Sequence, residues 1–251
     1  MHPGAFSNAP DPLGAGRALS GEVLLTAWER GSAEAPSLRA LSVLRTGYAT
    51  LDETDAATLP LAIRDFALLA LHARSFGPVL AAFAACEACG ERLEFTLQVA
   101  HIAATLQAAK AELLLAHDGG TLRLRMANTH DIAEAAAAPD LDAARNVLLA
   151  RCIEGTGLSA LPNAARDAAI AQLEAMHHAA EISISLACPA CDARQAIHFD
   201  IASFLWAEIR HAARGLLDEV HELAWAYGWA ESAILAMSPS RRAAYLDRVR
   251  G

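Results

Sequence analysis

Four of the five cysteines form two Cys-x-x-Cys pairs, a spacing that is typical of metal ligands. The pairs are Cys86 with Cys89 and Cys188 with Cys191. Two cysteines separated by two residues bring both sulfurs within reach of one Zn²⁺ ion, at about 2.3 Å each. Because the two pairs supply four thiolates and leave no open position, the sequence predicts a closed tetrahedral zinc site with a structural role.

The two pairs also belong to a weak internal repeat. Each copy has the form Cys-x-Ala-Cys-x-x-Arg, and the copies end at Arg92 and Arg194. A segment of alternating character follows each copy, as in the two halves of a zinc ribbon. However, 98 residues separate Cys89 from Cys188, whereas a compact ribbon has roughly 15–20. We therefore predict a split zinc ribbon, with a hairpin and several helices inserted over residues 91–187.

Alternatives to zinc remain open at this stage. A lone Cys-x-x-Cys can be a redox dithiol, although neither pair follows a tryptophan as in that fold. Two independent disulfides are disfavoured in a reducing compartment, and a degenerate site that has lost its metal is the main rival. The fifth cysteine, Cys152, lies in an apolar segment and is predicted to be a small buried residue.

The other residue types that carry chemistry do not form a catalytic motif. His221 and Glu222 begin like the zinc-protease motif His-Glu-x-x-His, but Trp225 occupies the place of the second histidine. The chain has no P-loop, no Gly-x-Gly-x-x-Gly after a strand and no Gly-x-Ser-x-Gly. His177 and His178 are predicted to be a solvated pair at a helix end. We expect no enzymatic activity and no small-molecule substrate.

The composition favours packed helices and argues against nucleic acid as a partner. Hydrophobic residues, many of them alanine, make up 54% of the 251 residues, and aromatic residues only 6%. Such a chain favours helices over a sandwich or a barrel. Lys and Arg number 20 against 29 Asp and Glu, a net charge of -9, whereas binding to nucleic acid normally needs a basic face.

The sequence shows no sign of membrane insertion or export. No apolar run approaches the roughly 18–20 residues that a membrane span needs. The N-terminus has no basic region followed by an apolar one, so no signal peptide is expected. These features predict a cytoplasmic protein without membrane contacts.

Hydrophobic spacing predicts the elements that must position the cysteines. Helices are predicted over residues 21–32, 37–46, 63–74, 131–137, 140–153, 163–178, 200–227, 231–237 and 239–248. Strands are predicted over residues 92–97, 111–117, 121–126, 181–186 and 196–200, while residues 79–85 are a short apolar approach to the first cysteine pair. A turn at Asp118-Gly119-Gly120 joins two of these strands into a hairpin.

The predicted fold class is α+β and mainly helical, with four regions along the chain. Residues 1–20 are a mobile N-terminal arm, and residues 21–85 form an N-terminal helical region. Residues 86–200 contain the split ribbon with its insertion, and residues 201–251 form a C-terminal helical segment. Four aromatic residues of this segment could form an interaction surface or could anchor the core where helices meet, and the sequence favours neither role over the other. They are Trp206, Trp225, Tyr227 and Trp229.

Several motifs resemble those of a known family. They include Leu-Pro-Leu-Ala-Ile-Arg-Asp at 59–65, Phe-Gly-Pro at 76–78, both cysteine pairs with their flanking residues, and Tyr-Gly-Trp-x-Glu at 227–231. Together they resemble the baseplate-assembly proteins encoded beside contractile phage tails and phage-tail-like contractile injection systems. The resemblance covers most of residues 20–251 and is strongest in the last 65 residues. The chain departs from it at Asp192, where the family pattern leads us to expect glycine.

The resemblance implies a non-enzymatic role in building or forming a baseplate, with other baseplate, hub or tail proteins as partners. Of its site residues, only the four cysteines are carried over to this chain. The protein would then be found in the cytoplasm or in the assembled particle. The alternative is a zinc-ribbon adaptor that binds nucleic acid or another protein complex. That alternative needs a basic patch, for which the candidates are Arg241, Arg242, Arg248 and Arg250.

Overall fold

The computed structural model describes residues 11–117, 119–155 and 160–251, and over these residues the fold is α+β and mainly helical, as predicted. The helices before the first cysteine pair are α1 (Glu22–Ala33), the 3-10 helix η1 (Pro36–Leu38), α2 (Arg39–Gly47), α3 (Glu53–Thr58) and α4 (Leu61–Ser75). The later helices are α5 (Val99–Ala108), α6 (Thr129–Ala136), α7 (Leu141–Cys152), α8 (Asn163–Ala179), α9 (Ile201–Tyr227), α10 (Glu231–Leu235) and α11 (Pro239–Arg250). The strands are β1 (Val79–Ala85), β2 (Arg92–Gln98), β3 (Glu112–His117), β4 (Gly120–Arg125), β5 (Ile153–Glu154), β6 (Ser183–Ala187) and β7 (Arg194–His198).

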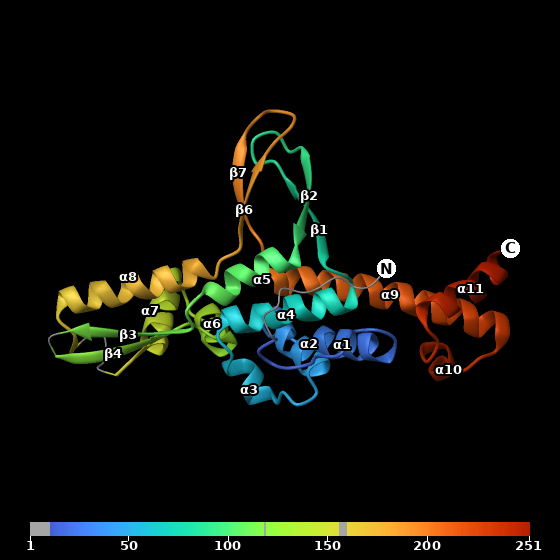
Figure 1. The fold of residues 1–251 in the computed structure, drawn as a ribbon, viewed down its shortest axis with the longest axis horizontal. Coiled ribbons are helices and arrows are strands. Elements are labelled where there is room, and N and C mark those ends of the chain that lie inside the picture. The colour runs from blue at the N-terminus through green and yellow to red at the C-terminus, as the bar shows by residue number, and fades with distance from the viewer. Residues whose placement is uncertain (1–10, 118, 156–159) are drawn as a thin grey trace.

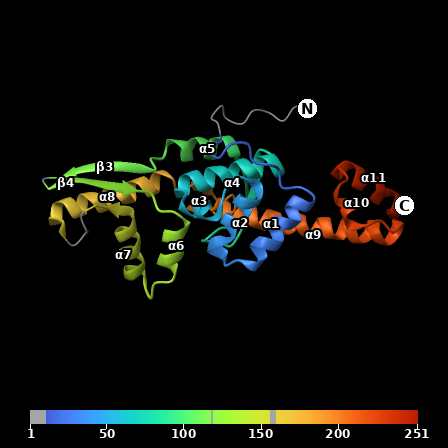
Figure 2. The ribbon, with the colours of Figure 1, turned by 90° about the horizontal axis from the view of Figure 1, so that it is seen from below.

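The molecule is elongated, with a helical body at its centre (Figure 1). The body consists of α1, α2, α4 and α5 packed around the first half of α9. At one end, β3, β4 and β5 pack with α6, α7 and α8 into a lobe, and at the other end α9 leaves the body and carries α10 and α11 (Figures 1 and 2). The hairpins β1–β2 and β6–β7 project from the body as an arm.

The core of the body is centred on α4, which is enclosed by its neighbours. Leu68, Leu69 and Leu71 of α4 are almost fully buried and share one apolar cluster with Leu44 of α2 and Ile209 of α9. A helix that is apolar on all sides is stable only when it is buried in this way. The packing of α4 on α9 also sets the positions from which the two hairpins leave the body.

One polar pair is buried in the contact between α4 and α9. The side chain of His72 is completely buried, and its Nε2 atom lies 2.6 Å from Oε2 of Glu208. The rings of Phe76 and Phe204 flank the imidazole, with centroids 5.7 and 5.8 Å away. The pair therefore joins the two helices inside an otherwise apolar core.

The described part of the predicted N-terminal arm packs on the body. The Tyr48 hydroxyl donates to Oδ2 of Asp11 at 2.6 Å, and the guanidinium of Arg74 donates to the same oxygen at 2.8 Å. Burial and the neighbouring carboxylate raise the pKa of Tyr48. Leu19 is only 2% exposed, so residues 11–20 are anchored at both ends, while residues 1–10 lie outside the described part of the chain.

The lobe has its own apolar core beneath an antiparallel sheet in the order β3-β4-β5. Leu122 and Leu124 of β4 are fully buried and cluster with Leu173 of α8. The predicted hairpin is formed by β3 and β4, although Asp118 of its turn lies outside the described residues. Cys152 is fully buried, as predicted, and this burial raises the pKa of its thiol to about 11.

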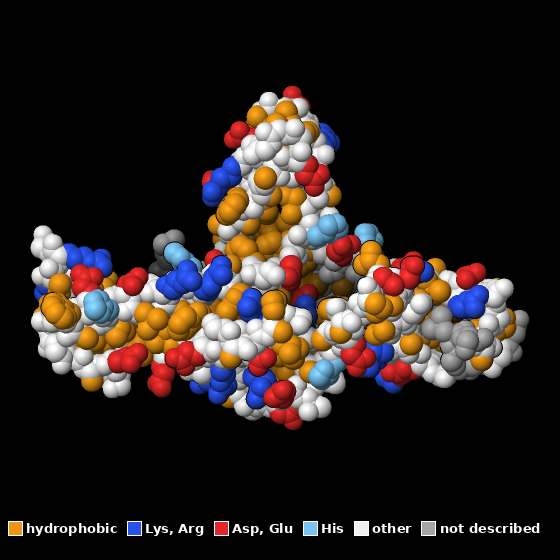
Figure 3. Space-filling view, turned by 180° about the vertical axis from the view of Figure 1, so that it is seen from behind, with side chains coloured by type: hydrophobic (Ala, Val, Ile, Leu, Met, Phe, Trp, Pro, Cys, Tyr) orange, Lys and Arg blue, Asp and Glu red, His pale blue; other side chains and the backbone are white. Residues whose placement is uncertain are grey.

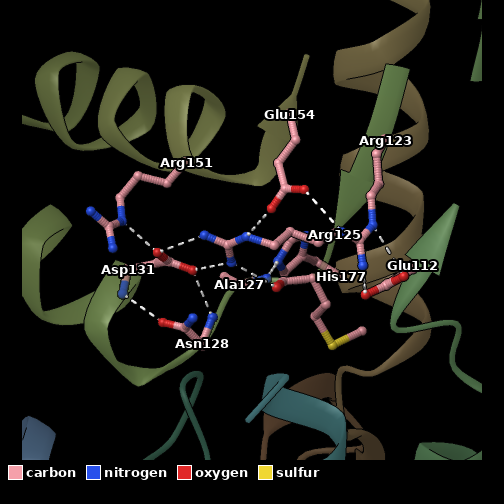
Figure 4. Close-up of polar contacts among 10 residues, drawn as sticks. Glu112, Arg123, Arg125, Ala127, Asn128, Asp131, Arg151, Glu154 and His177 are labelled. Atoms are coloured by element: carbon pink, nitrogen blue, oxygen red, sulfur yellow. Dashed lines mark hydrogen bonds and ion pairs between the residues drawn. The ribbon is translucent and has the colours of Figure 1, made fainter. Parts of the chain in front are cut away.

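A buried carboxylate joins the lobe's elements together (Figure 4). Asp131, at the start of α6, is completely buried and accepts hydrogen bonds from the guanidinium groups of Arg125 and Arg151. Asn128 and Asp131 form a capping box, each accepting a bond from the other's backbone amide at 3.0 and 2.9 Å. Burial opposes ionisation of Asp131, but the donors outweigh it and lower its pKa to about 2.

The strand β1 and the helices α3 and α5 were not among the predicted elements. Residues 79–85 form a strand because all seven pair with β2, from Val79 opposite Gln98 to Ala85 opposite Arg92. α5 forms because it buries one face, including Ile102 and Leu106, in the central core. The strand β1 depends on pairing with β2, which follows it in the chain. The helix α5 depends on packing against a core that includes the distant helix α9.

The prediction of a solvated histidine pair at the end of α8 was wrong for one member. The side chain of His178 is 82% exposed, but His177 is half-buried. Its Nε2 atom accepts a hydrogen bond from the backbone amide of Ala127 at 3.0 Å. His177 is therefore a structural contact between α8 and the segment that follows β4.

Candidate metal centre

The two cysteine pairs lie at the tips of the two hairpins that form the arm. Ala85 pairs with Arg92 in the first hairpin and Ala187 with Arg194 in the second, so each cysteine pair occupies the turn beyond the last strand pair. The hairpins are separate two-stranded sheets. A two-stranded hairpin is marginally stable by itself in water, so each hairpin depends on contacts with the other and with the body.

The two turns have the same backbone hydrogen bonds, as the internal repeat suggests. In each turn the amide of the first cysteine donates to the carbonyl five residues later, at 2.8 and 2.9 Å. The amide four residues later donates back to the carbonyl of that cysteine, also at 2.8 and 2.9 Å. The two cysteine-containing turns therefore present their sulfurs in equivalent ways.

Asp192, where the resemblance led us to expect glycine, takes a left-handed backbone conformation. Its φ is 58°, and the matching residue in the first turn, Gly90, has a φ of 78°. Aspartate is among the few residues that enter the left-handed region at low cost. The substitution therefore leaves the geometry of the second turn equivalent to that of the first.

The four sulfurs converge at the tip of the arm. Sγ of Cys86 lies 3.7 Å from Sγ of Cys191, and Sγ of Cys89 lies 3.7 Å from Sγ of Cys188. All four sulfurs lie within 4.8 Å of one another, and this is the one such cluster of ligand-type residues in the described part of the chain. Tetrahedral bonds of about 2.3 Å place sulfurs about 3.8 Å apart. The site can hold a metal ion, and its spacing and donors fit zinc.

The environment of the sulfurs favours thiolate at one position in particular. Cys86 and Cys188 are buried, whereas Cys89 and Cys191 are exposed. The backbone amides of Cys89 and Ala88 donate to the sulfur of Cys86 and lower its pKa to about 7. Thiolate is the form that binds metal, so Cys86 is the sulfur most readily deprotonated for binding, whereas the neighbouring thiols raise the pKa of Cys89 and of Cys191.

Gln195 of β7 is a structural residue of the site that the sequence reasoning missed. Its side-chain amide donates to the carbonyl of Ala85 at 3.0 Å, and its carbonyl accepts from the amide of Glu87 at 2.9 Å. These bonds connect the second hairpin to the first beside the cysteine turns. No local motif marks a glutamine for this role, because its partners lie more than 100 residues away.

The segment between the cysteine pairs forms more than an insertion into a ribbon. α5 directly follows β2 and contributes Val99 and Ile102 to the core of the body. The chain then builds the whole lobe before it returns as β6. The first hairpin therefore precedes the lobe in the chain and the second follows it, and the two meet again only in the folded protein.

The predicted C-terminal aromatic set divides between core and surface. Trp206 is 8% exposed and lies against the body, whereas Trp225 is 87% exposed. Tyr227 stacks on Trp229 with ring centroids 4.5 Å apart, and Tyr245 of α11 meets the edge of this stack. One member is therefore a core anchor, and the others lie at the far end of the molecule.

The C-terminal arginines do not form an unpaired basic patch. Arg242 is buried and pairs with Glu219 at 2.7 Å. Arg250 pairs with Glu222 at 2.8 Å, and this pairing lowers the pKa of Glu222. Two of the four arginines that could have formed a basic patch for nucleic acid are therefore paired with acidic residues of α9.

Comparison with protein families identifies the relatives of this chain. A family model described as T4 bacteriophage base plate protein matches residues 23–156, just over half of the chain. The chain belongs to this family. Membership confirms the resemblance to phage baseplate proteins.

The baseplate family match spans the helical body up to α5, the first cysteine pair and most of the lobe. The second cysteine pair and α9 lie beyond it. Comparisons with curated proteins and with solved structures gave no match. Within the described ranges, none of this baseplate protein's helices is both long and apolar enough to cross a membrane.

Proposed function

We propose that this member of the T4 baseplate family is a structural component or assembly factor of a contractile-tail or injection-system baseplate, without enzymatic activity. The family match over residues 23–156 is the observation that carries the proposal. The elongated shape supports it, because a lobe, an arm and a C-terminal extension give one chain several separate surfaces for protein contacts (Figure 1).

Zinc bound by the four cysteines would stabilise the arm. The donor set leaves no open coordination position, so a bound zinc ion supplies four bonds to sulfur and no catalytic water. Cys86 and Cys89 would hold it from the first hairpin, and Cys188 and Cys191 from the second. In small zinc-finger peptides, binding of structural zinc contributes an apparent free energy of folding of about 10–16 kcal/mol. The ion would add to the contacts that already join the two hairpins, which are the hydrogen bonds of Gln195 and an apolar cluster that includes Leu93 and Leu186.

The partners that we propose are other baseplate, hub or tail proteins. The arm exposes large apolar side chains, with Phe83 63% and Val79 42% exposed. Figure 3 shows hydrophobic side chains gathered on the lower half of the arm. Exposed aromatic residues also mark the C-terminal extension, and aromatic residues are enriched at interface hot spots. Both regions project from the body, where a neighbouring subunit can reach them.

The function can be tested in the tail-producing system that encodes the chain. Removal of the protein should abolish assembled tails in electron micrographs, and the full-length wild-type protein supplied separately should restore them. A chain truncated after residue 230, which lacks α10 and α11 but keeps the part of α9 that packs in the body, should fail to restore them and should no longer copurify with baseplate proteins. A Cys152→Ala variant is the matched control for expression. Normal tails in the absence of the protein would refute the proposal.

A further inference from the structure

The long helix α9 has one face that packs on nothing within the described chain. Its buried side runs along the whole helix, from Ile201 and Leu205 in the body to Val220 and Leu223 under α10 and α11. The opposite side carries six exposed residues at spacings of four and three. They are Ala207, His211, Arg214, Asp218, His221 and Trp225. This spacing keeps them on one straight stripe, about 27 Å long at 1.5 Å per residue.

Two residues on this face are poorly explained by contact with water alone. Trp225 is 87% exposed and anchors one end of the stripe. Gly215 lies beside the middle of the stripe, and a Cβ atom placed there would meet nothing within 4 Å. Glycine in a helix interior costs roughly 0.5–1 kcal/mol relative to alanine. No packing within the described chain explains a glycine at this position. The close approach of a second backbone would explain it, because only glycine leaves room for such an approach.

The charges of the stripe are divided about its middle. Arg214 precedes Gly215, and Asp218 follows it. Neither Arg214 nor Asp218 has an ion-pair partner among the described residues, and arginine four residues before an aspartate is the less favourable order on one helix. When two copies of such a helix lie antiparallel, the basic half of each copy faces the acidic half of the other.

We infer that this stripe is the contact between two copies of the chain, with their α9 helices antiparallel about a two-fold axis beside Gly215. The axis places Arg214 opposite Asp218 of the second copy, twice in each dimer. It also places Trp225 over Ala207 of the second copy, where the small side chain leaves room for the indole.

A second copy is the occupant that these observations select. A two-fold contact requires each surface to match itself, and the Arg214–Asp218 and Ala207–Trp225 pairs both have the same midpoint in the sequence. The stripe is mainly polar, so the association is reversible and weakens with salt. The inference is independent of the metal site and of the role in a baseplate.

The test is a charge exchange in the full-length protein, measured by sedimentation over a range of concentrations at low salt. The wild type should dimerise. Arg214→Asp and Asp218→Arg should each weaken dimerisation by at least about tenfold, because each creates two like-charge contacts. A mixture of these two variants should form heterodimers, since the charges that meet across the axis are then opposite in sign again. Both positions are exposed, so at a concentration where all the proteins are monomeric the thermal unfolding of the variants should match that of the wild type.

The heterodimer distinguishes the two-fold contact from any effect within one chain. Trp225→Ala provides a second measurement that does not depend on charge and should also weaken dimerisation. A wild type that stays monomeric, or charge variants that self-associate as the wild type does, would overturn the inference. So would a mixture of the two variants that remains monomeric while the wild type dimerises.

Discussion

Replacement of Asp131 by asparagine should remove a large part of the stability of the lobe. The carboxylate is completely buried and receives three side-chain hydrogen bonds from Arg125 and Arg151. Breaking a buried ion pair by removing one partner costs about 3–5 kcal/mol. Arg125 and Arg151 keep 21% and 35% of their side-chain surface in water and retain Glu154 and Glu134 as partners. The expected loss at pH 7 is therefore near the lower limit, about 3 kcal/mol.

The same residue predicts how stability depends on pH. The pKa of Asp131 falls from 3.8 to about 2 in the folded protein, which corresponds to roughly 2.5 kcal/mol. Since the folded-state pKa is depressed, this contribution is present above pH 4 and is lost as the pH falls through 2. About 1 kcal/mol of it should be lost by pH 3. The stability deficit of Asp131→Asn should therefore narrow by about that amount between pH 7 and pH 3.

Urea denaturation of the two proteins at both pH values measures this difference. Glu112→Gln is the matched control, because it removes a carboxylate that pairs with Arg123 at 2.6 Å while both side chains are about half exposed. That exposed pair should contribute less than about 1 kcal/mol. A deficit of Asp131→Asn no larger than that of the control, or one that stays constant between pH 7 and pH 3, would show that the buried network does not act as described.

Two further predictions concern the metal centre and the glycines. Full-length wild-type protein should contain one zinc ion per chain by elemental mass spectrometry, Cys188→Ser should lose it, and Cys152→Ala should retain it. Wild-type protein without metal would refute the zinc assignment. Gly31→Ala should destabilise the protein by about 1–3 kcal/mol, because the new Cβ would overlap with the indole ring of Trp206. Gly215→Ala should instead stabilise the monomer by up to about 1 kcal/mol. Equal effects in urea denaturation would contradict this interpretation of the two sites.

The convergence of the cysteines could be predicted from the sequence because their signal is local. A Cys-x-x-Cys turn imposes nearly the same geometry wherever it occurs, and two such turns need only one ion between them. Long helices such as α9 were also predictable, since their apolar spacing persists over many turns. The far end of α9 shows this well, because Val220 and Leu223 continue the buried side that begins in the body.

The features that were missed depend on contacts between distant segments. β1 is an alanine-rich apolar segment, and only pairing with β2 makes it a strand. Gln195 looks like an ordinary strand residue until the first hairpin is placed beside it. The burial of Asp131 and of His177 likewise arises from elements that meet only in the folded chain.

The position of the hairpins on the body determines what a metal ion can stabilise. In a small zinc module the ion closes a loop whose ends are otherwise free, so its binding energy appears as folding energy. Here β1 follows α4 directly and β7 leads directly into α9. Those helices already pack together in the core, where His72 and Glu208 also join them. The ends of the long loop between the cysteine pairs are therefore held near each other without metal. A zinc ion at the tips would act chiefly on the arm, by keeping two marginal hairpins in one rigid projection.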